Sequence, residues 1–202
     1  MRETAVRYYT DTIRQFGATA RGVDWNSEES QVLRFAQLLR LSEETAGVSV
    51  IDYGCGYGAF VDYLRSIDRQ WKYTGFDISE SMIDHARAVH GSDPATAFTT
   101  DSDALEPADY TIASGLFNVK QDHPASAWQE YALATLDMMN RLSLRGFAFN
   151  MLSTYSDPGK RRNDLFYAEP GFFFDHCKRR FAPRVALLHD YPLFEFTILV
   201  RK

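Results

Sequence analysis

Val50-Ile-Asp-Tyr-Gly-Cys-Gly-Tyr-Gly58 is the stretch that decides the fold of this chain, and Ala59 follows it directly. The apolar residues before the glycines predict a buried strand over residues 48–53. Apolar residues at helical spacing predict a helix just after them: Phe60, Val61, Leu64 and Ile67. A glycine-rich turn between a buried strand and a helix is typical of α/β domains that bind a nucleotide, because the backbone there can approach a ligand closely.

Short apolar strands alternate with helical patterns from this turn to the end of the chain. Further strands are predicted at 71–76, 95–99, 110–114, 146–152, 185–189 and 194–200, and helices begin near Ser79, at 126–142 and at 172–180. This alternation predicts an α/β fold with a doubly wound sheet that carries helices on both faces. The turn around residues 190–192 is too short for a parallel crossover, so the last strand is expected to run antiparallel. We expect a Rossmann-like sheet of seven strands.

Residues 1–46 precede this predicted domain, which spans residues 47–202. Tyr8, Ile13 and Phe16 indicate one helix, and the stretch Asn26-Ser27-Glu28-Glu29 is placed to cap a second helix that carries Phe35 and other apolar residues. Such a segment can lie over a ligand cleft as a lid, or it can simply cover the sheet. Both interpretations stay open from the sequence.

Composition narrows the class of protein. The 202 residues suit a single α/β domain, and the formal net charge of −5 argues against a nucleic-acid partner, since domains that contact phosphates are usually basic. No window approaches the roughly 20 apolar residues that a membrane span needs. Cys55 and Cys177 lie far apart and indicate neither a disulfide framework nor a zinc site. We expect a cytoplasmic protein, a monomer or a homodimer, whose partner is a small molecule and which needs no metal.

The glycine turn is compatible with two cofactors. It matches GxGxG, and because residue 59 is alanine it also matches the dinucleotide fingerprint GxGxxG/A. Asp52 favours the GxGxG interpretation over the dinucleotide fingerprint. A carboxylate just before the turn would repel a pyrophosphate but would attract a cationic ligand. Asp52 can also be a structural cap for the turn. Asp77, at the end of the second predicted strand, is placed to accept hydrogen bonds from ribose hydroxyls, which either cofactor has.

Three segments resemble class I S-adenosylmethionine-dependent methyltransferases in order and spacing: Val50 to Gly58, Thr74 to Ser79 with Met82, and Phe98 to Asp101. The resemblance implies a seven-stranded sheet of order 3-2-1-4-5-7-6 with strand 7 antiparallel. It further implies S-adenosyl-L-methionine as the cofactor and transfer of its methyl group to a small molecule. It also implies a role for each matching position. Gly54, Cys55 and Gly56 approach the methionine part near Asp52, Asp77 holds the ribose, Ile78 and Met82 flank the adenine, Asp101 and Ser102 meet the adenine edge, and Ser114 lies beside the methionine amine.

The acceptor side is predicted from the rule that ligands bind beyond the carboxyl ends of the strands in an open α/β sheet. His189 is the best candidate for a base, because an imidazole titrates near neutrality, although a histidine at a strand end can equally be structural. Asn118 and Tyr191 follow other strands at the same edge and are the further catalytic candidates. No Pro-Pro motif of the amide-methylating kind follows the fourth strand, so an oxygen acceptor is slightly favoured over nitrogen. A nicotinamide-dependent oxidoreductase and a non-catalytic cofactor-binding module remain the alternatives.

Overall fold

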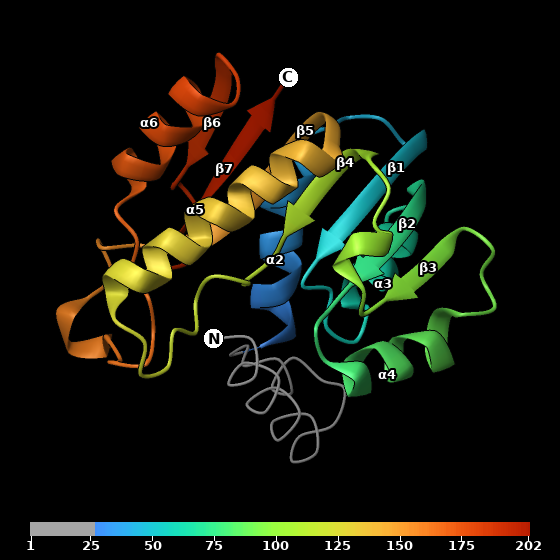
Figure 1. The fold of residues 1–202 in the computed structure, drawn as a ribbon, viewed down its shortest axis with the longest axis horizontal. Coiled ribbons are helices and arrows are strands. Elements are labelled where there is room, and N and C mark those ends of the chain that lie inside the picture. The colour runs from blue at the N-terminus through green and yellow to red at the C-terminus, as the bar shows by residue number, and fades with distance from the viewer. Residues whose placement is uncertain (1–26) are drawn as a thin grey trace.

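The computed structural model describes residues 27–202, so the predicted helix around Tyr8, Ile13 and Phe16 lies outside the described residues. The described chain is built on one seven-stranded sheet of order β3-β2-β1-β4-β5-β7-β6, as predicted (Figure 1). Its strands are β1 (Ala46–Tyr53), β2 (Gln70–Phe76), β3 (Thr96–Thr99), β4 (Ala108–Ala113), β5 (Ser143–Leu152), β6 (Arg184–Leu188) and β7 (Glu195–Arg201).

The direction of the last strand is confirmed. β1 pairs in parallel with β2 and β4, and β4 pairs in parallel with β5. β7 runs antiparallel to both of its neighbours, β5 and β6, and its first residue, Glu195, pairs with Leu152 at the end of β5. Because β7 starts where β5 ends, its first side chains lie at the same edge of the sheet as the carboxyl ends of the parallel strands.

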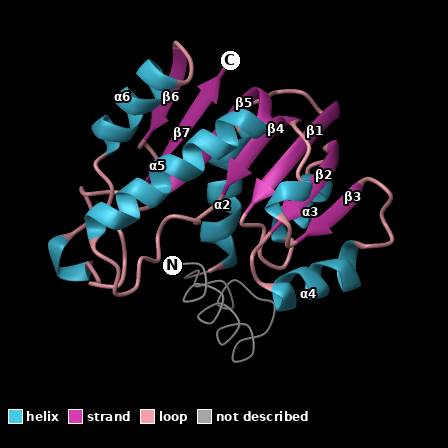
Figure 2. Cartoon of the chain, viewed as in Figure 1, coloured by secondary structure: helices cyan, strands magenta, loops and turns pink. Residues whose placement is uncertain are grey.

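Helices cover both faces of the sheet (Figures 1 and 2). α2 (Glu28–Leu39), α3 (Ala59–Ser66) and α4 (Glu80–His90) pack against one face, whereas α5 (Ala125–Leu142) and α6 (Pro170–Arg180) pack against the other. Two short 3₁₀ turns, η2 (Ser102–Ala104) and η3 (Pro158–Lys160), lie in the connecting segments. None of the helices in this described part of the chain combines the length and the apolar character of a membrane span.

The alternation of side chains along the central strands produces two cores, one on each face. Phe147 and Phe149 of β5 are completely buried on the face covered by α5 and α6, and Ala148 between them belongs to the opposite core. Strands that are buried on both faces need apolar residues at consecutive positions, which is why residues 146–152 form an almost continuous apolar run.

α2 covers the sheet at the centre of the first face. Its N-cap is Ser27, which lies in the stretch predicted to cap the helix and whose hydroxyl accepts a hydrogen bond from the backbone N–H of Ser30 at 3.2 Å. Phe35 and Leu38 are buried against β5, β7 and α3. This helix is therefore part of the packed domain, and the division of the chain after residue 46, like a lid role for the residues before α2, stays a prediction.

Candidate functional site

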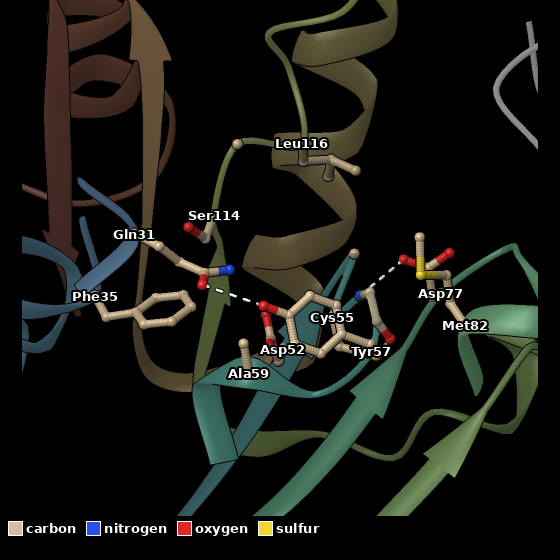
Figure 3. A pocket seen from close by; sticks show the side chains of 13 residues that line it. Gln31, Phe35, Asp52, Cys55, Tyr57, Ala59, Asp77, Met82, Ser114 and Leu116 are labelled. Carbon is tan, nitrogen blue, oxygen red and sulfur yellow. Dashed lines mark hydrogen bonds between the residues drawn. The ribbon is translucent and has the colours of Figure 1, made fainter. Parts of the chain in front are cut away.

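A pocket opens beyond the carboxyl ends of β1, β2 and β4. The empty space within it is about 600 Å³, counting the part that is open to solvent. Figure 3 shows Gln31 and Phe35 entering from α2 on one side, with Asp77 and Met82 on the opposite side. The lining residues are Gln31, Phe35, Asp52, Gly54, Cys55, Gly56, Tyr57, Ala59, Asp77, Met82, Ser114, Gly115 and Leu116.

Most of the residues predicted to bind a cofactor share this pocket. Seven of them line it: Asp52, Gly54, Cys55, Gly56, Asp77, Met82 and Ser114. The other three are not among the residues that line it. Ile78 packs beside the small core formed by Ile51, Phe76 and Leu105, and Asp101 is exposed and caps η2 by accepting a hydrogen bond from the backbone N–H of Asp103 at 2.9 Å. Ser102 is the first residue of η2.

The glycine turn is tied to the end of β2. The backbone N–H groups of Gly54 and Cys55 both donate to the carbonyl of Phe76, at 2.7 and 2.9 Å. Gly54 has a φ of +89°, and a Cβ at this position would stand 2.9 Å from the Leu116 side chain, so only glycine fits without strain. Because its first amide groups already have acceptors within the protein, the turn offers few donors to a pyrophosphate.

Asp77 joins the turn to α4. One carboxylate oxygen accepts from the backbone N–H of Gly56 at 3.0 Å, and the other accepts from that of Ser79 at 2.9 Å. Burial raises the pKa of Asp77, and these two hydrogen bonds lower it in part. A carboxylate oxygen can accept more than one hydrogen bond, so the side chain keeps acceptor capacity toward the pocket.

Asp52 forms the floor of the pocket. It is 2% exposed, and its carboxylate accepts a hydrogen bond from the hydroxyl of Tyr73 at 2.8 Å. Burial raises the pKa of Asp52 to about 7; the bond from Tyr73 opposes this change, and the charge of Asp77 adds to it. A cationic ligand would lower this pKa again, because an opposite charge favours the ionised carboxylate.

Burial also raises the pKa of the neighbouring Cys55 thiol. This cysteine is therefore a neutral side chain that packs in the turn rather than a nucleophile.

The segment after β4 forms the third wall. Gly115 has a φ of +71°, which turns the chain so that Leu116 packs over Gly54. The hydroxyl of Ser114 is buried in the pocket wall without a hydrogen-bond partner among the described residues. A buried hydroxyl of this kind is costly unless a ligand or water satisfies it, so it marks the wall as polar and unsatisfied.

The sequence did not single out Gln31 or Tyr57. Gln31 lies one helical turn before Phe35 on α2, and its side-chain carbonyl accepts from the hydroxyl of Tyr57 at 3.3 Å (Figure 3). The apolar stripe of α2 predicts a buried Phe35, but it does not predict which edge of the sheet the helix meets. The helical spacing from Phe35 back to Gln31 is the only signal in the sequence that could have pointed to Gln31.

The three catalytic candidates lie outside this lining. His189 follows β6 and is exposed, with its ring centroid 5.7 Å from that of Tyr155 and 6.3 Å from that of Phe196. Tyr191 is buried, and its hydroxyl shares a hydrogen bond of 2.9 Å with the hydroxyl of Thr197. Burial raises the pKa of Tyr191, so its phenol stays protonated over the physiological range.

Asn118 is also buried, and both ends of its amide are engaged. Its oxygen accepts from the backbone N–H of Leu152 at 3.1 Å, and its nitrogen lies 3.5 Å from Glu195 as a long hydrogen bond. Asn118 thus connects the segment after β4 to the ends of β5 and β7. Within residues 27–202, no three His, Cys, Asp or Glu side chains are grouped so as to hold a metal ion.

Comparisons with known proteins agree on one class of enzyme. A family profile described as a methyltransferase domain matches residues 26–193. Rv1506c of Mycobacterium tuberculosis (strain ATCC 25618 / H37Rv), whose name places it among the methyltransferases, is 47% identical over 165 residues; the match covers 81% of this chain and 99% of that protein.

Solved structures support the fold. The chain is similar to magnesium protoporphyrin IX methyltransferase from Synechocystis PCC 6803 with bound S-adenosylhomocysteine, with a TM-score of 0.63 and 17% identity over 86% of this chain and 83% of the other. A complex of DhpI with S-adenosylmethionine and HEP gives a TM-score of 0.66 and 13% identity over 99% and 97% of the two chains. Both of these proteins were solved with S-adenosylmethionine or its demethylated product.

Proposed function

Because the chain belongs to the family of methyltransferase domains and is an enzyme that uses S-adenosyl-L-methionine, we propose that it transfers the methyl group to an oxygen or a nitrogen of a small-molecule acceptor. The observation that carries the proposal is the pocket beyond β1, β2 and β4. Two carboxylates and an unsatisfied hydroxyl line it, and the exposed His189 lies at the same edge of the sheet.

The residues of the pocket fit this cofactor. S-adenosylmethionine is cationic at its amine and its sulfonium sulfur and has no phosphate, so Asp52 and Asp77 suit it better than a dinucleotide. We assign the ribose hydroxyls to Asp77, the methionine amine to Ser114, and the adenine to the apolar side that includes Met82. When bound, the cofactor supplies a methyl group on a sulfonium sulfur, an electrophile that needs no further activation.

Ile78, Asp101 and Ser102 belong to the same proposal on the adenine side. Asp101 keeps one carboxylate oxygen beyond the one that caps η2, so it can accept from an adenine amino group while the cap stays in place. Ser102 offers its backbone at the start of η2. We rank these three below the seven lining residues, because none of them lines the pocket.

His189 is our candidate for the base. In a transfer to a hydroxyl, an imidazole nitrogen of His189 accepts the proton of the acceptor oxygen. The ring is exposed and makes only ring contacts to other described residues, so its nitrogens are accessible to an acceptor. An amine acceptor that binds in its neutral form depends less on this proton transfer than a hydroxyl does. The effect of replacing His189 on the rate therefore indicates which kind of acceptor is used.

Asn118 and Tyr191 are proposed as positioning residues. The amide of Asn118 fixes the segment after β4 on the end of β5, and the phenol of Tyr191 stays protonated and is held by Thr197. Neither group suits the role of a base. Each can orient the acceptor by fixing the segments that surround it at the carboxyl edge of the sheet.

The test is a methyl-transfer assay with the full chain and S-adenosylmethionine labelled in its methyl group. Small phenols, carboxylic acids, alcohols and amines are offered in turn, and both the labelled product and S-adenosylhomocysteine are measured. We expect a methyl ether, ester or amine, and we expect His189→Ala to slow formation of an oxygen-methylated product by about 100-fold or more.

His176→Ala is the matched control, because His176 lies on α6 and also makes ring contacts, to Phe172 and Phe181. It should leave the rate within about twofold of the wild type by the same reasoning. Label recovered on a carbon atom, or on a macromolecule only, would contradict the proposed acceptor.

A further inference from the structure

A buried charge pair connects α2 to the beginning of β7. Two guanidinium nitrogens of Arg34, Nε and Nη2, donate to the carboxylate of Glu195 at 2.8 and 2.6 Å. Arg34 is 5% exposed and Glu195 is 1% exposed. The pair is almost fully removed from water, so further hydrogen bonds are needed to compensate the lost hydration.

Two amides complete the arrangement. Asn150 of β5 donates to Glu195 at 2.5 Å, and Asn118, after β4, makes the longer contact of 3.5 Å. Arg34, Asn118, Asn150 and Glu195 are called the Glu195 network below. Its members come from α2, the segment after β4, β5 and β7, so one carboxylate joins four parts of the chain.

The network reaches the cofactor pocket from α2. Gln31 and Phe35 line the pocket, and Arg34 lies between them in the same two turns of the helix. Fixing the guanidinium on Glu195 fixes the rotation and depth of this helix, and thereby the position of both lining side chains. The contact of Gln31 with Tyr57 depends on the same placement.

The network also reaches the pocket through Asn150. The side-chain oxygen of Asn150 accepts from the backbone N–H of Gly115 at 2.8 Å. Gly115 is the residue with positive φ that sets Leu116 over Gly54, next to Ser114. A chain of direct contacts therefore runs from Arg34 through Glu195 and Asn150 to the glycine turn.

We propose that the Glu195 network is a positioning device that holds two walls of the cofactor pocket, α2 and the segment after β4, in register for S-adenosylmethionine. This rests on the proposed function of the pocket. Arg34, Asn150 and Glu195 touch neither the proposed cofactor nor the acceptor and act through Gln31, Phe35 and Gly115. Their loss weakens cofactor binding more than the accompanying loss of stability explains.

A buried charge pair is by itself weak evidence for stability, because well-packed apolar residues often stabilise a core equally well. The link to both pocket walls supplies a reason for keeping the charges here. Asn150 provides the most direct link between the charges and the pocket. Its amide nitrogen donates to Glu195, and its amide oxygen accepts from the backbone N–H of Gly115 in the pocket wall.

The experiment is calorimetric titration of the full chain with S-adenosylhomocysteine, at a temperature where circular dichroism shows each variant folded. Glu195→Gln keeps the shape of the side chain and removes the charge that binds Arg34. Ile198→Ala is the matched control: Ile198 is completely buried on the same strand but faces the opposite core, so its truncation costs stability without touching the network.

We expect Glu195→Gln to raise the Kd at least tenfold and Ile198→Ala to leave it within twofold of the wild type. A Kd within twofold for folded Glu195→Gln, or an equal rise in both variants, overturns the inference. If Glu195→Gln does not fold, Arg34→Lys, which keeps the charge and loses the paired donors, is judged by the same criteria. Wild-type protein that binds no S-adenosylhomocysteine overturns the cofactor site itself, which distinguishes the two failures.

Discussion

Replacing Asp52 by asparagine tests the electrostatics of the pocket floor. Burial raises the pKa of Asp52 from 3.8 to about 7, so the folded protein binds this proton more tightly than the unfolded chain does. The ionised carboxylate therefore destabilises the fold without cofactor, by an amount that grows as the pH rises from 3.8 to about 7 and is constant above it.

The magnitude follows from that pKa. At about 1.4 kcal/mol for each pH unit, the full effect is at most about 4 kcal/mol, and we expect about 2–4 kcal/mol at neutral pH and above. The asparagine oxygen can still accept from Tyr73, whereas its NH₂ group needs a new acceptor, which costs about 1 kcal/mol at every pH. The distinctive result is thus the pH dependence of the difference between the two proteins.

The assay is urea denaturation of both full-length proteins at about pH 5 and about pH 8. We measure the free energy of unfolding of Asp52→Asn minus that of the wild type at each pH. We expect this difference to be about 2–3 kcal/mol more favourable to the variant at about pH 8 than at about pH 5. The same substitution should raise the Kd for S-adenosylhomocysteine, because it removes a carboxylate that we propose attracts the cationic ligand.

Asp109→Asn serves as the control whose difference from the wild type should not change between about pH 5 and about pH 8. Burial acts to raise the pKa of Asp109, but hydrogen bonds from the backbone and hydroxyl of Ser49 and the charge of Arg145 hold it below its ordinary value. Its ionised form therefore stabilises the fold above that ordinary value, and the benefit is lost as the pH falls through the lowered pKa. A difference between Asp52→Asn and the wild type that does not change with pH would refute the argument for Asp52.

Three further substitutions test the walls of the pocket by calorimetry with S-adenosylhomocysteine. Gly54→Ala would bring a Cβ to 2.9 Å from Leu116 at a φ of +89°, and the resulting strain of about 1–3 kcal/mol should weaken binding about tenfold or more; normal affinity would show that the turn has room to adjust. Asp77→Asn should weaken binding by about 1–3 kcal/mol, because hydrogen bonds to a charged group are lost, and an unchanged Kd would remove Asp77 from the site. Ser114→Ala should leave the free energy of unfolding within about 1 kcal/mol of the wild type yet weaken binding about fivefold; a loss of stability without a change in affinity would make the hydroxyl structural.

Much of the architecture could be predicted because its signals are local. The apolar run before Gly54, the helical spacing after it and the short turn before β7 each depend on neighbouring residues, and together they predict the alternation of strands and helices and the antiparallel last strand. The strand order, which the structure confirms, was implied by the resemblance to class I methyltransferases. Asp77 could be predicted as well, since its place at the end of β2 puts it beside the glycine turn in any fold of this topology.

The rule that ligand-binding residues follow the strands was less informative for the outer strands β3 and β6. Asp101 follows β3 as predicted, yet its carboxylate caps η2, because a short polar side chain before a 3₁₀ turn finds the nearest backbone N–H. His189 follows β6, and the strand order alone separates β6 from β1 by three strands. The sequence placed both at the correct edge and could not give their distance from the pocket.

The Glu195 network lies beyond any local pattern. Arg34 and Glu195 are separated by 161 residues, and each alone reads as an ordinary charged residue on a helix or at the start of a strand. The sequence by itself determined the alternation of strands and helices and the glycine turn, because hydrophobic periodicity and turn chemistry act between neighbours. Only the tertiary structure decided that α2 crosses the end of β7, because that contact depends on how whole elements pack once their apolar faces are buried.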